Sequence, residues 1–441
     1  MQLKRHFKLT SAQVIIFGFA GLIILATLLL MLPISSADGN FTPFLNAAFT
    51  ATSATCVTGL VVYDTATHWS AFGQAVILIL IQIGGMGVVT IAVCLSRLSG
   101  KKLGLLGRSF MQDSISAPRL GGIMKFTNFI IITALSIELI GALSLMPTFC
   151  GRFGLKGIWY AFFHAISAFC NAGFDVMGHT GEFSSLTSFV GNIPVNTVVM
   201  LLIIIGGIGF STWNDIKTHG IRLRRYTLQS KVILVITALF IILPALFFFF
   251  VQFSDMKLKE RVLSSLFQSV TLRTAGFNTV DFSALGGGTL AIMTVFMLIG
   301  GAPGSTAGGM KVTTVAIMFF SMLSVFSRKR EVRVGNRRID DENVKTAAAI
   351  LMMYVVLFFA GGIAISISDG LPLQKCLFET ASAIGTVGLS TGITTSLSAF
   401  SRVVIILLMY IGRVGGLTVI FAAAKSSVVN SKLPLEKITV G

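Results

Sequence analysis

Charged side chains are scarce in this sequence. They make up 12% of the 441 residues, while 54% of the residues are hydrophobic and the mean hydropathy is +0.87. A soluble globular chain carries about 25% charged residues, so this composition excludes a soluble enzyme, a disordered protein and a secreted scaffold built on disulfides. It points instead to a lipid bilayer as the main surroundings of the chain.

Metal-ligand and disulfide patterns are lacking as well. The five cysteines are scattered, and none forms a CxxC pair or lies at ligand spacing from a histidine. The pattern therefore indicates neither a cysteine metal site nor a disulfide framework. The sequence also has no HExxH motif and no recognisable nucleophile–base pair. We therefore expect a protein that is not an enzyme and that has no covalently bound cofactor.

Long apolar runs, by contrast, are abundant. A helix needs about 20 mostly apolar residues to cross a bilayer. Eight such runs lie near residues 14–33, 72–96, 126–147, 192–214, 232–253, 287–326, 346–368 and 399–424. The sixth is too long for one span and is interrupted from Gly300 to Gly309. The sequence thus predicts an all-α polytopic membrane protein with eight transmembrane spans.

Basic residues alternate between the loops. Twenty-four Lys and Arg residues lie before the first run, in every second loop and after the last run, whereas eight lie in the other loops. Because cytoplasmic loops are enriched in Lys and Arg, this split predicts that both termini are cytoplasmic. The same topology accounts for most of the net charge of +17, so we expect no nucleic-acid binding.

The four loops on the opposite side share a pattern. Each contains an apolar stretch of about 11 residues, too short to cross a bilayer of about 30 Å. Each stretch precedes one glycine: Gly59, Gly173, Gly276 or Gly388. Ser-Ala lies six residues before the glycine in three loops, and a second glycine cluster recurs 24 to 33 residues after it. The pattern therefore predicts four copies of a unit that consists of a helix, a re-entrant pore helix, a glycine turn and a second helix.

Four such turns around one axis would form a ring of backbone carbonyls. Glycine tolerates positive φ, and carbonyl oxygens can replace the hydration shell of a cation. The C-terminal ends of the short helices would add partial negative charge. The pattern thus predicts a central cation pore. The alternative is that these glycines only allow close helix packing, which suits the downstream clusters well.

With these features the chain resembles the Ktr/Trk/HKT superfamily of potassium transporters, and most closely its Ktr-type membrane subunit. Eight spans, four pore loops and the string Gly-Gly-Ala-Pro-Gly-Ser-Thr-Ala-Gly-Gly-Met-Lys carry the resemblance, which covers nearly the whole chain. Four repeats are expected around a central pore, with eight spans and four re-entrant pore helices. They are 14–97 (pore loop 44–60), 126–217 (pore loop 158–174), 231–326 (pore loop 261–277, gate loop 300–310) and 345–425 (pore loop 374–390).

The resemblance implies a K⁺ selectivity filter in four strands that end at the four glycines, with K⁺ there as the only metal. The expected filter residues are Thr55, Cys56, Val57, Thr58, Gly59, Cys170, Asn171, Ala172, Gly173, Leu272, Arg273, Thr274, Ala275, Gly276, Gly385, Thr386, Val387 and Gly388. The first strand is closest to the potassium-channel signature, and the second and third depart from it most. Arg273 and Glu379, both in filter regions, are expected to pair with each other or with outer carboxylates.

The interruption of the sixth run is expected to gate the pore. The resemblance implies a gate loop formed by Gly300, Gly301, Ala302, Pro303, Gly304, Ser305, Thr306, Ala307, Gly308 and Gly309. A packing kink is the alternative. The string is not a nucleotide-binding P-loop, because Met310 separates Gly309 from Lys311 and that motif requires Gly-Lys-Ser/Thr.

A charged residue at membrane depth is a functional candidate by default, and Arg413 lies within the eighth run. The resemblance implies that it faces the pore below the filter and opposes free cation flow. It could also hydrogen-bond the carbonyls or hydroxyls of the gate loop. The alternative is an ion pair with an acidic partner.

The resemblance implies K⁺ uptake across a bacterial plasma membrane, driven by the membrane potential, with coupling to Na⁺ left open. It also implies a homodimer and a cytosolic ring of RCK-type nucleotide-binding regulatory subunits. The basic segment 327–345 and the C-terminal segment to Gly441 are the expected contacts. Two other classes remain open: a secondary transporter for an organic substrate, and an accessory subunit of an ion-pumping ATPase that transports nothing alone.

Overall fold

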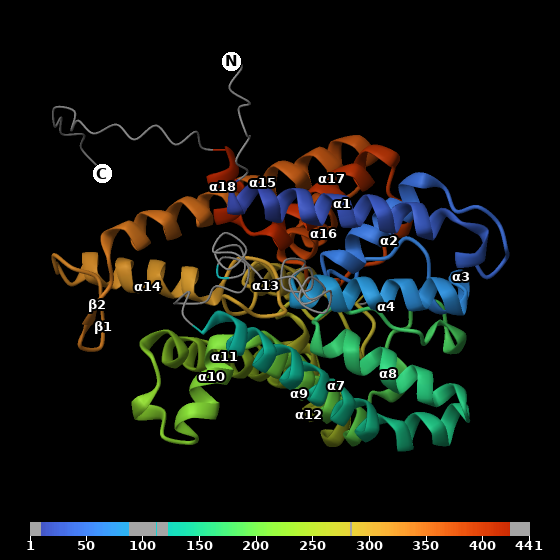
Figure 1. The fold of residues 1–441 in the computed structure, drawn as a ribbon, viewed down its shortest axis with the longest axis horizontal. Coiled ribbons are helices and arrows are strands. Elements are labelled where there is room, and N and C mark those ends of the chain that lie inside the picture. The colour runs from blue at the N-terminus through green and yellow to red at the C-terminus, as the bar shows by residue number, and fades with distance from the viewer. Residues whose placement is uncertain (1–9, 88–111, 113–121, 283–284, 424–441) are drawn as a thin grey trace, which may run out of the picture.

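A computed structural model describes residues 10–87, 112, 122–282 and 285–423, and this part of the chain is predominantly helical (Figure 1). Four of its helices are long and apolar enough to cross a membrane. They are α1 (Ser11–Met31), α7 (Ile123–Phe153), α11 (Leu228–Phe247) continued by the π-helical turn η5 (Phe248–Gln252), and α15 (Asp341–Asp369). The side chains of Thr10 and Thr227 cap α1 and α11 by accepting backbone N–H groups of the first turn, which fixes where these helices begin.

A shorter helix follows each long one. The four are α2 (Phe44–Thr55), α8 (Lys156–Phe169), α12 (Leu258–Thr271) and α16 (Leu373–Gly385), of 12 to 14 residues. At 1.5 Å per residue they measure about 18–21 Å, less than the bilayer core. Each packs against the long helix that precedes it, and its C-terminal half is buried. These helices therefore end inside the molecule.

In each repeat a third helical run follows the short helix, and this run is either divided into two helices or cut short. The runs consist of α4 (Ala71–Met86), α9 (Ile193–Gly207) with α10 (Phe210–His219), α13 (Gly287–Met297) with α14 (Val312–Phe326), and α17 (Ala399–Val414) with α18 (Gly416–Ala423). The sequence predicts an interruption in the sixth apolar run alone. The structure also breaks the fourth, where α9 and α10 meet at 97°, and the eighth. The end of the second run, 88–96, lies outside the described residues.

The remaining elements are small. They are the turns η1 (Pro33–Ser35), η2 (Gly178–Thr180), η3 (Thr187–Phe189), η4 (Leu223–Arg225) and η6 (Thr394–Ser396), the one-turn helix α3 (Thr65–His68), and an antiparallel hairpin of β1 (Arg333–Val334) and β2 (Arg337–Arg338). Figure 1 shows the hairpin and α10 at one end of the long axis and α3 at the other. The two ends of the molecule thus carry different kinds of loop.

Contacts between the helices close into a circle. Each short helix packs against a helix of the preceding run: α8 against α4, α12 against α9, α16 against α13, and α2 against α17. The last of these pairs joins the beginning of the chain to its end. The four short helices therefore surround one common centre.

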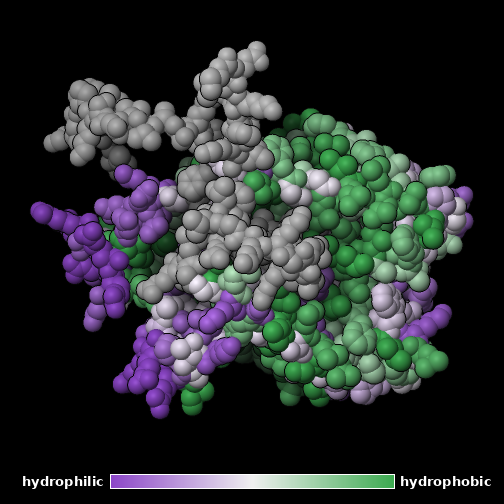
Figure 2. Space-filling view, viewed as in Figure 1, coloured by the Kyte–Doolittle hydropathy of each residue, from purple (hydrophilic) through white to green (hydrophobic). Residues whose placement is uncertain are grey.

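The outer surface of this arrangement is apolar. Large hydrophobic side chains are exposed on all four long helices, for example Ile24 (62%), Ile132 (66%), Val235 (65%) and Val356 (55%). Figure 2 shows a broad hydrophobic band across the visible face, with hydrophilic residues gathered toward the two ends. An exposed apolar surface of this kind fits contact with lipid.

Candidate functional site

Four glycines meet at the centre of the circle. A methyl group added to Gly59 would lie within 3.0 Å of Ala172 O, one on Gly173 2.7 Å from Ala275 O, one on Gly276 2.7 Å from Val387 O, and one on Gly388 within 3.0 Å of Thr58 O. Each glycine therefore touches the backbone of the next strand, and the fourth returns to the first. All four have positive φ, between 69° and 94°, a conformation that glycine adopts without strain.

The backbone handedness alternates along each of these strands. The residue two positions before each glycine also has positive φ: Val57 (58°), Asn171 (58°), Thr274 (63°) and Thr386 (51°). Positive φ is a genuine outlier for a β-branched residue such as valine, and such strain persists only where the surroundings impose it. A backbone that alternates in this way turns successive carbonyl oxygens toward one side of the strand.

Hydroxyl groups at the ends of the short helices hold the strands in place. The Oγ atoms of Ser53 and Ser382 accept the N–H of Gly59 (3.1 Å) and of Gly388 (3.0 Å). In the second strand, Ser167 Oγ donates instead to Phe174 O, at 2.7 Å. These serines belong to the recurring Ser-Ala pair of the sequence, so the repeat has a direct structural role.

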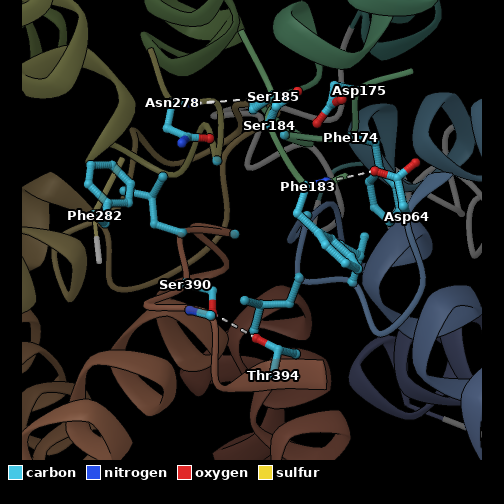
Figure 3. Close-up of a pocket in the computed structure, with 18 of the residues that line it drawn as sticks. Asp64, Phe174, Asp175, Phe183, Ser184, Ser185, Asn278, Phe282, Ser390 and Thr394 are labelled. Atoms are coloured by element: carbon cyan, nitrogen blue, oxygen red, sulfur yellow. Dashed lines mark hydrogen bonds between the residues drawn. The ribbon is translucent and has the colours of Figure 1, made fainter. Parts of the chain in front are cut away.

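A cavity of about 450 Å³ opens on one side of the ring. The four glycines line its floor, and Asp64, Asp175, Glu182 and Asp281 are among its other lining residues; no Lys or Arg is among the described residues that line it. Hydrogen bonds between loops that lie far apart in the sequence hold its wall, such as Phe183 N to Asp64 Oδ2 (2.9 Å) and Asn278 N to Ser185 Oγ (3.3 Å) (Figure 3). A mouth lined by acids concentrates cations.

A second cavity of about 320 Å³ adjoins this mouth and adds to its negative charge. It is lined in part by Asp38 and His68. Hydrogen bonds from the Ser36 hydroxyl and the Asn40 amide hold the pKa of Asp38 well below its usual range, and burial lowers the pKa of His68. At neutral pH the carboxylate is therefore charged and the imidazole uncharged.

On the other side of the ring, the loop between α13 and α14 contains the ten predicted gate residues. Its N–H groups bond to carbonyls exposed where other helices end: Ala302 N to Gly207 O (3.0 Å), Thr306 N to Gly206 O (3.2 Å) and Gly309 N to Gly412 O (3.2 Å). The Thr306 hydroxyl donates to Phe169 O at the end of α8, at 3.0 Å. The loop thus bridges α8, α9 and α17, and Gly308 and Gly309 lie against Thr386 and Gly385 of the fourth strand.

Three glycines end neighbouring helices and leave carbonyls near those ends free to accept hydrogen bonds from the loop or from Arg413. Gly87, Gly209 and Gly415 have φ of 87°, 89° and 90°. Each lies three residues after the first glycine of a downstream cluster, at Gly84, Gly206 and Gly412. Those first glycines leave room for the carbonyl oxygens of Thr55, Phe169 and Ile384, so close packing does explain them. The sequence reasoning missed that these three glycines end helices, although their regular spacing was visible.

Arg413 connects the loop to α4. Its guanidinium donates to Thr306 O, to Gly84 O and, at 3.0 Å, to Gly85 O. Among the described residues, the ion pairs found are those of Glu331 with Arg333 and Arg338, so an acidic partner for Arg413 is not supported. The charge instead lies between backbone carbonyls, at the wall of a cavity of about 350 Å³ that Lys311 and Gly415 also line.

The expected pairing of Arg273 with Glu379 or with an outer carboxylate is wrong. Arg273 Nη2 donates to Thr237 Oγ1 at 3.2 Å. The Glu379 carboxylate accepts hydrogen bonds from Ser390 Oγ and from Thr394 Oγ1, the latter at 3.1 Å to each oxygen. Both charged groups are buried, and each finds hydroxyl partners near its own strand rather than the other's charge.

The chain is similar to known cation transport proteins along nearly its whole length. A profile of the family described as "TrkH: Cation transport protein" matches residues 9–432. The chain is 38% identical to the potassium/sodium uptake protein NtpJ of Enterococcus hirae, over 98% of each chain. It is 37% identical to the Ktr system potassium uptake protein B of Bacillus subtilis, over 98% of this chain and 97% of that one.

A solved structure has the same fold. The potassium transporter TrkH from Vibrio parahaemolyticus superposes with a TM-score of 0.75 at 18% identity, covering 96% of this chain and 87% of that one. With the apolar helices described above, this likeness indicates a multi-pass membrane protein. The match of the family profile and the identity to these relatives show that the chain belongs to the TrkH family of cation transport proteins.

Proposed function

We propose that this chain takes up K⁺ through the glycine ring, as the translocating membrane subunit of a Ktr-type system. The observation that carries the proposal is the closed contact of Gly59, Gly173, Gly276 and Gly388, each at the end of a strand with alternating backbone handedness. A ring of carbonyls can replace the hydration shell of K⁺. The printed names of the relatives, which are potassium or potassium/sodium uptake proteins, support this choice of ion.

The proposed topology has eight spans and four re-entrant pore helices, in the four repeats given above, with both termini in the cytoplasm of a bacterial cell. The circular packing of α2, α8, α12 and α16 supports it. It is supported further by the position of α10 and the basic hairpin at the end of the molecule opposite α3. In this orientation the acidic cavity is extracellular.

An ion entering from outside would pass the acidic cavity, lose its water in the filter and then meet the loop 300–309 and Arg413. The filter comprises the four strands that precede the ring glycines. Support for a gate comes from the hydrogen bonds of the loop, which join it to helix ends of three other runs. A barrier held by a few such bonds can open without unfolding the helices around it.

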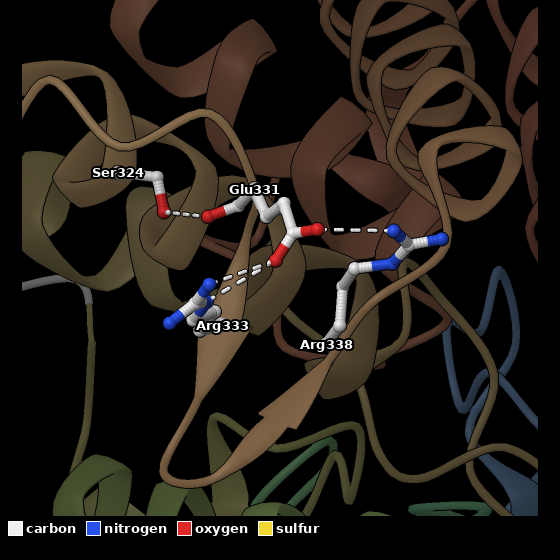
Figure 4. A network of polar contacts seen from close by, with 4 residues as sticks. All are labelled: Ser324, Glu331, Arg333 and Arg338. Carbon is white, nitrogen blue, oxygen red and sulfur yellow. Dashed lines mark hydrogen bonds and ion pairs between the residues drawn. The ribbon is translucent and has the colours of Figure 1, made fainter.

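We propose a homodimer that binds a cytosolic RCK-type regulatory ring. The β1–β2 hairpin supports a contact surface on segment 327–345, because it projects from the helices and holds Glu331 between Arg333 and Arg338, at 3.0 Å from each (Figure 4). The C-terminal segment 424–441 lies outside the described residues. Co-purification of the ring from native detergent extracts is the expected result, and its loss after deletion of 331–338 would identify the hairpin as a contact.

The proposal is tested by cation flux in proteoliposomes that contain the purified chain alone. We expect K⁺ flux driven by an imposed potential, well above that of protein-free liposomes and above Na⁺ flux. Repeating the measurement with and without Na⁺ tests coupling. No cation flux from folded protein would favour the accessory-subunit alternative, and flux of an organic solute without K⁺ would favour a secondary transporter.

A further inference from the structure

A short segment after α10 exposes basic and apolar side chains together. Beyond Gly220, the chain reads Ile221-Arg222-Leu223-Arg224-Arg225, and all five side chains are exposed, with Ile221 at 96% and Leu223 at 58%. We call this segment and Lys217, which precedes it on α10, the arginine turn. Figure 2 shows hydrophilic residues gathered here beside the hydrophobic band. Exposed aliphatic residues interleaved with arginines are costly in water and typical of contact with a membrane surface.

The turn is held in one conformation. Asp215 Oδ2 accepts the N–H and the hydroxyl of Thr227, at 3.0 and 2.8 Å. Tyr226 Oη donates to Gly220 O, and Lys231 Nζ donates to Arg224 O at 2.8 Å. These bonds use the backbone of the turn and leave its three guanidinium groups free to face outward. Asp215 is the single acid between 208 and 231, and its carboxylate is buried and bonded to Thr227.

The arginine turn also lies beside the part of α7 where the exposed surface changes from polar to apolar. Because α10 bends by 97° from α9, Lys217 reaches α7 and places its Nζ 4.3 Å from the centre of the Phe129 ring. Phe129 lies six residues into α7, about 9 Å from its start. The next exposed side chains along that helix are large and apolar, such as Ile132 and Leu135. Lys217 thus marks the boundary between charged and apolar surface.

We propose that the arginine turn binds the headgroups of anionic phospholipids in the cytoplasmic leaflet, with Ile221 and Leu223 inserted at the base of the headgroup layer. The assignment to the cytoplasmic leaflet rests on the topology proposed above. The binding of anionic lipid by the turn does not depend on whether the protein transports K⁺. Charge complementarity selects this partner, since Lys217 and three arginines face outward without an exposed acid between them. Each basic residue near an anionic surface contributes about 1 kcal/mol. The aliphatic pair favours lipid over a soluble anion, which has no apolar part to bury.

The test is lipid titration of the delipidated full chain in neutral detergent, followed by native mass spectrometry. Phosphatidylglycerol is the anionic probe, and phosphatidylcholine and inorganic phosphate are the comparisons. We expect the triple variant Arg222→Gln/Arg224→Gln/Arg225→Gln to bind phosphatidylglycerol at least about tenfold more weakly, with phosphatidylcholine binding unchanged. Ile221→Ser/Leu223→Ser is expected to weaken the binding of phosphatidylglycerol as well, while all three arginines remain.

The matched control is Arg333→Gln/Arg337→Gln/Arg338→Gln, which removes the same charge from another exposed segment. Because Glu331, Asp340 and Asp341 accompany these arginines, little net charge is available there to bind an anionic headgroup, and the affinity is expected to stay within about twofold of wild type. Three results would each overturn the proposal: equal affinity in the arginine-turn variant, equal loss in the control, or complete displacement of the lipid by inorganic phosphate. Unchanged lipid affinity with lost binding of the cytosolic ring would assign the turn to a protein partner instead. All variants alter exposed side chains, so unchanged melting temperatures are expected and confirm folding.

Discussion

Replacing Gly388 by alanine is expected to remove most of the preference for K⁺ over Na⁺. The added Cβ would lie within 3.0 Å of Thr58 O and 3.0 Å from the Cα of Gly59, and neither backbone atom can rotate away. Both the ring contact and the φ of 92° would therefore have to change. The collision displaces the Thr58 carbonyl from the ring, and a displacement that weakens K⁺ binding relative to Na⁺ binding by about 1.4 kcal/mol lowers the ratio of the two affinities tenfold.

The measurement is the ratio of K⁺ to Na⁺ flux in proteoliposomes, which we expect to fall at least about tenfold. Gly392→Ala is a matched control, because Gly392 has nearly the same φ, 91°, but nothing within 4 Å of an added Cβ. It imposes the same backbone strain without the collision at the ring, so its ratio is expected to stay near that of wild type. An unchanged ratio in a folded Gly388→Ala protein would mean that selectivity arises elsewhere.

The position of the ring was predictable, whereas its backbone conformation was not. Gly59 and its three counterparts recur at nearly regular distances after short apolar stretches, and this periodicity is visible in one sequence. Val57, by contrast, has no local preference for positive φ. Its conformation follows from the Oγ of Ser53 bonding Gly59 N and from contacts with neighbouring strands. Interactions of this kind appear only once the four repeats are assembled.

Two other features could not be predicted from the sequence: where some helices end, and which groups Arg413 bonds. Gly209 lies in an apolar run that continues past it, and glycine is common in membrane helices, so hydropathy alone gave no reason to end a helix there. The partners of Arg413 are backbone carbonyls at Thr306, Gly84 and Gly85, more than 100 residues away. A sequence reveals which side chains carry charge, but every residue has a carbonyl, so it does not reveal which ones become acceptors.

Arg413→Gln is expected to raise K⁺ flux about tenfold. The guanidinium donates to the loop 300–309 and to the end of α4 at the same time, so in the proposed mechanism it both ties the loop down and adds positive charge to the proposed ion path. A hydrogen bond to a charged group contributes about 1.5–3 kcal/mol, and losing about 1.4 kcal/mol of closed-state stability raises the open population about tenfold while that population is small. Flux of K⁺ in proteoliposomes at a fixed potential measures the effect.

Two further variants distinguish the effect of the positive charge of Arg413 from the effect of its hydrogen bonds to the loop. Arg402→Gln, on the same helix but about 16 Å toward its other end, removes a guanidinium that bonds Asn46 Oδ1 and Thr395 O, and it is expected to leave flux near wild type. Arg413→Lys keeps the charge but cannot bridge acceptors as a planar fork does. If flux stays low in the lysine variant, the positive charge is the barrier; if it rises as in Arg413→Gln, the hydrogen bonds hold the gate. Flux no higher than wild type in folded Arg413→Gln would contradict both roles, because neither a removed charge nor a released loop can leave the pore as closed as before.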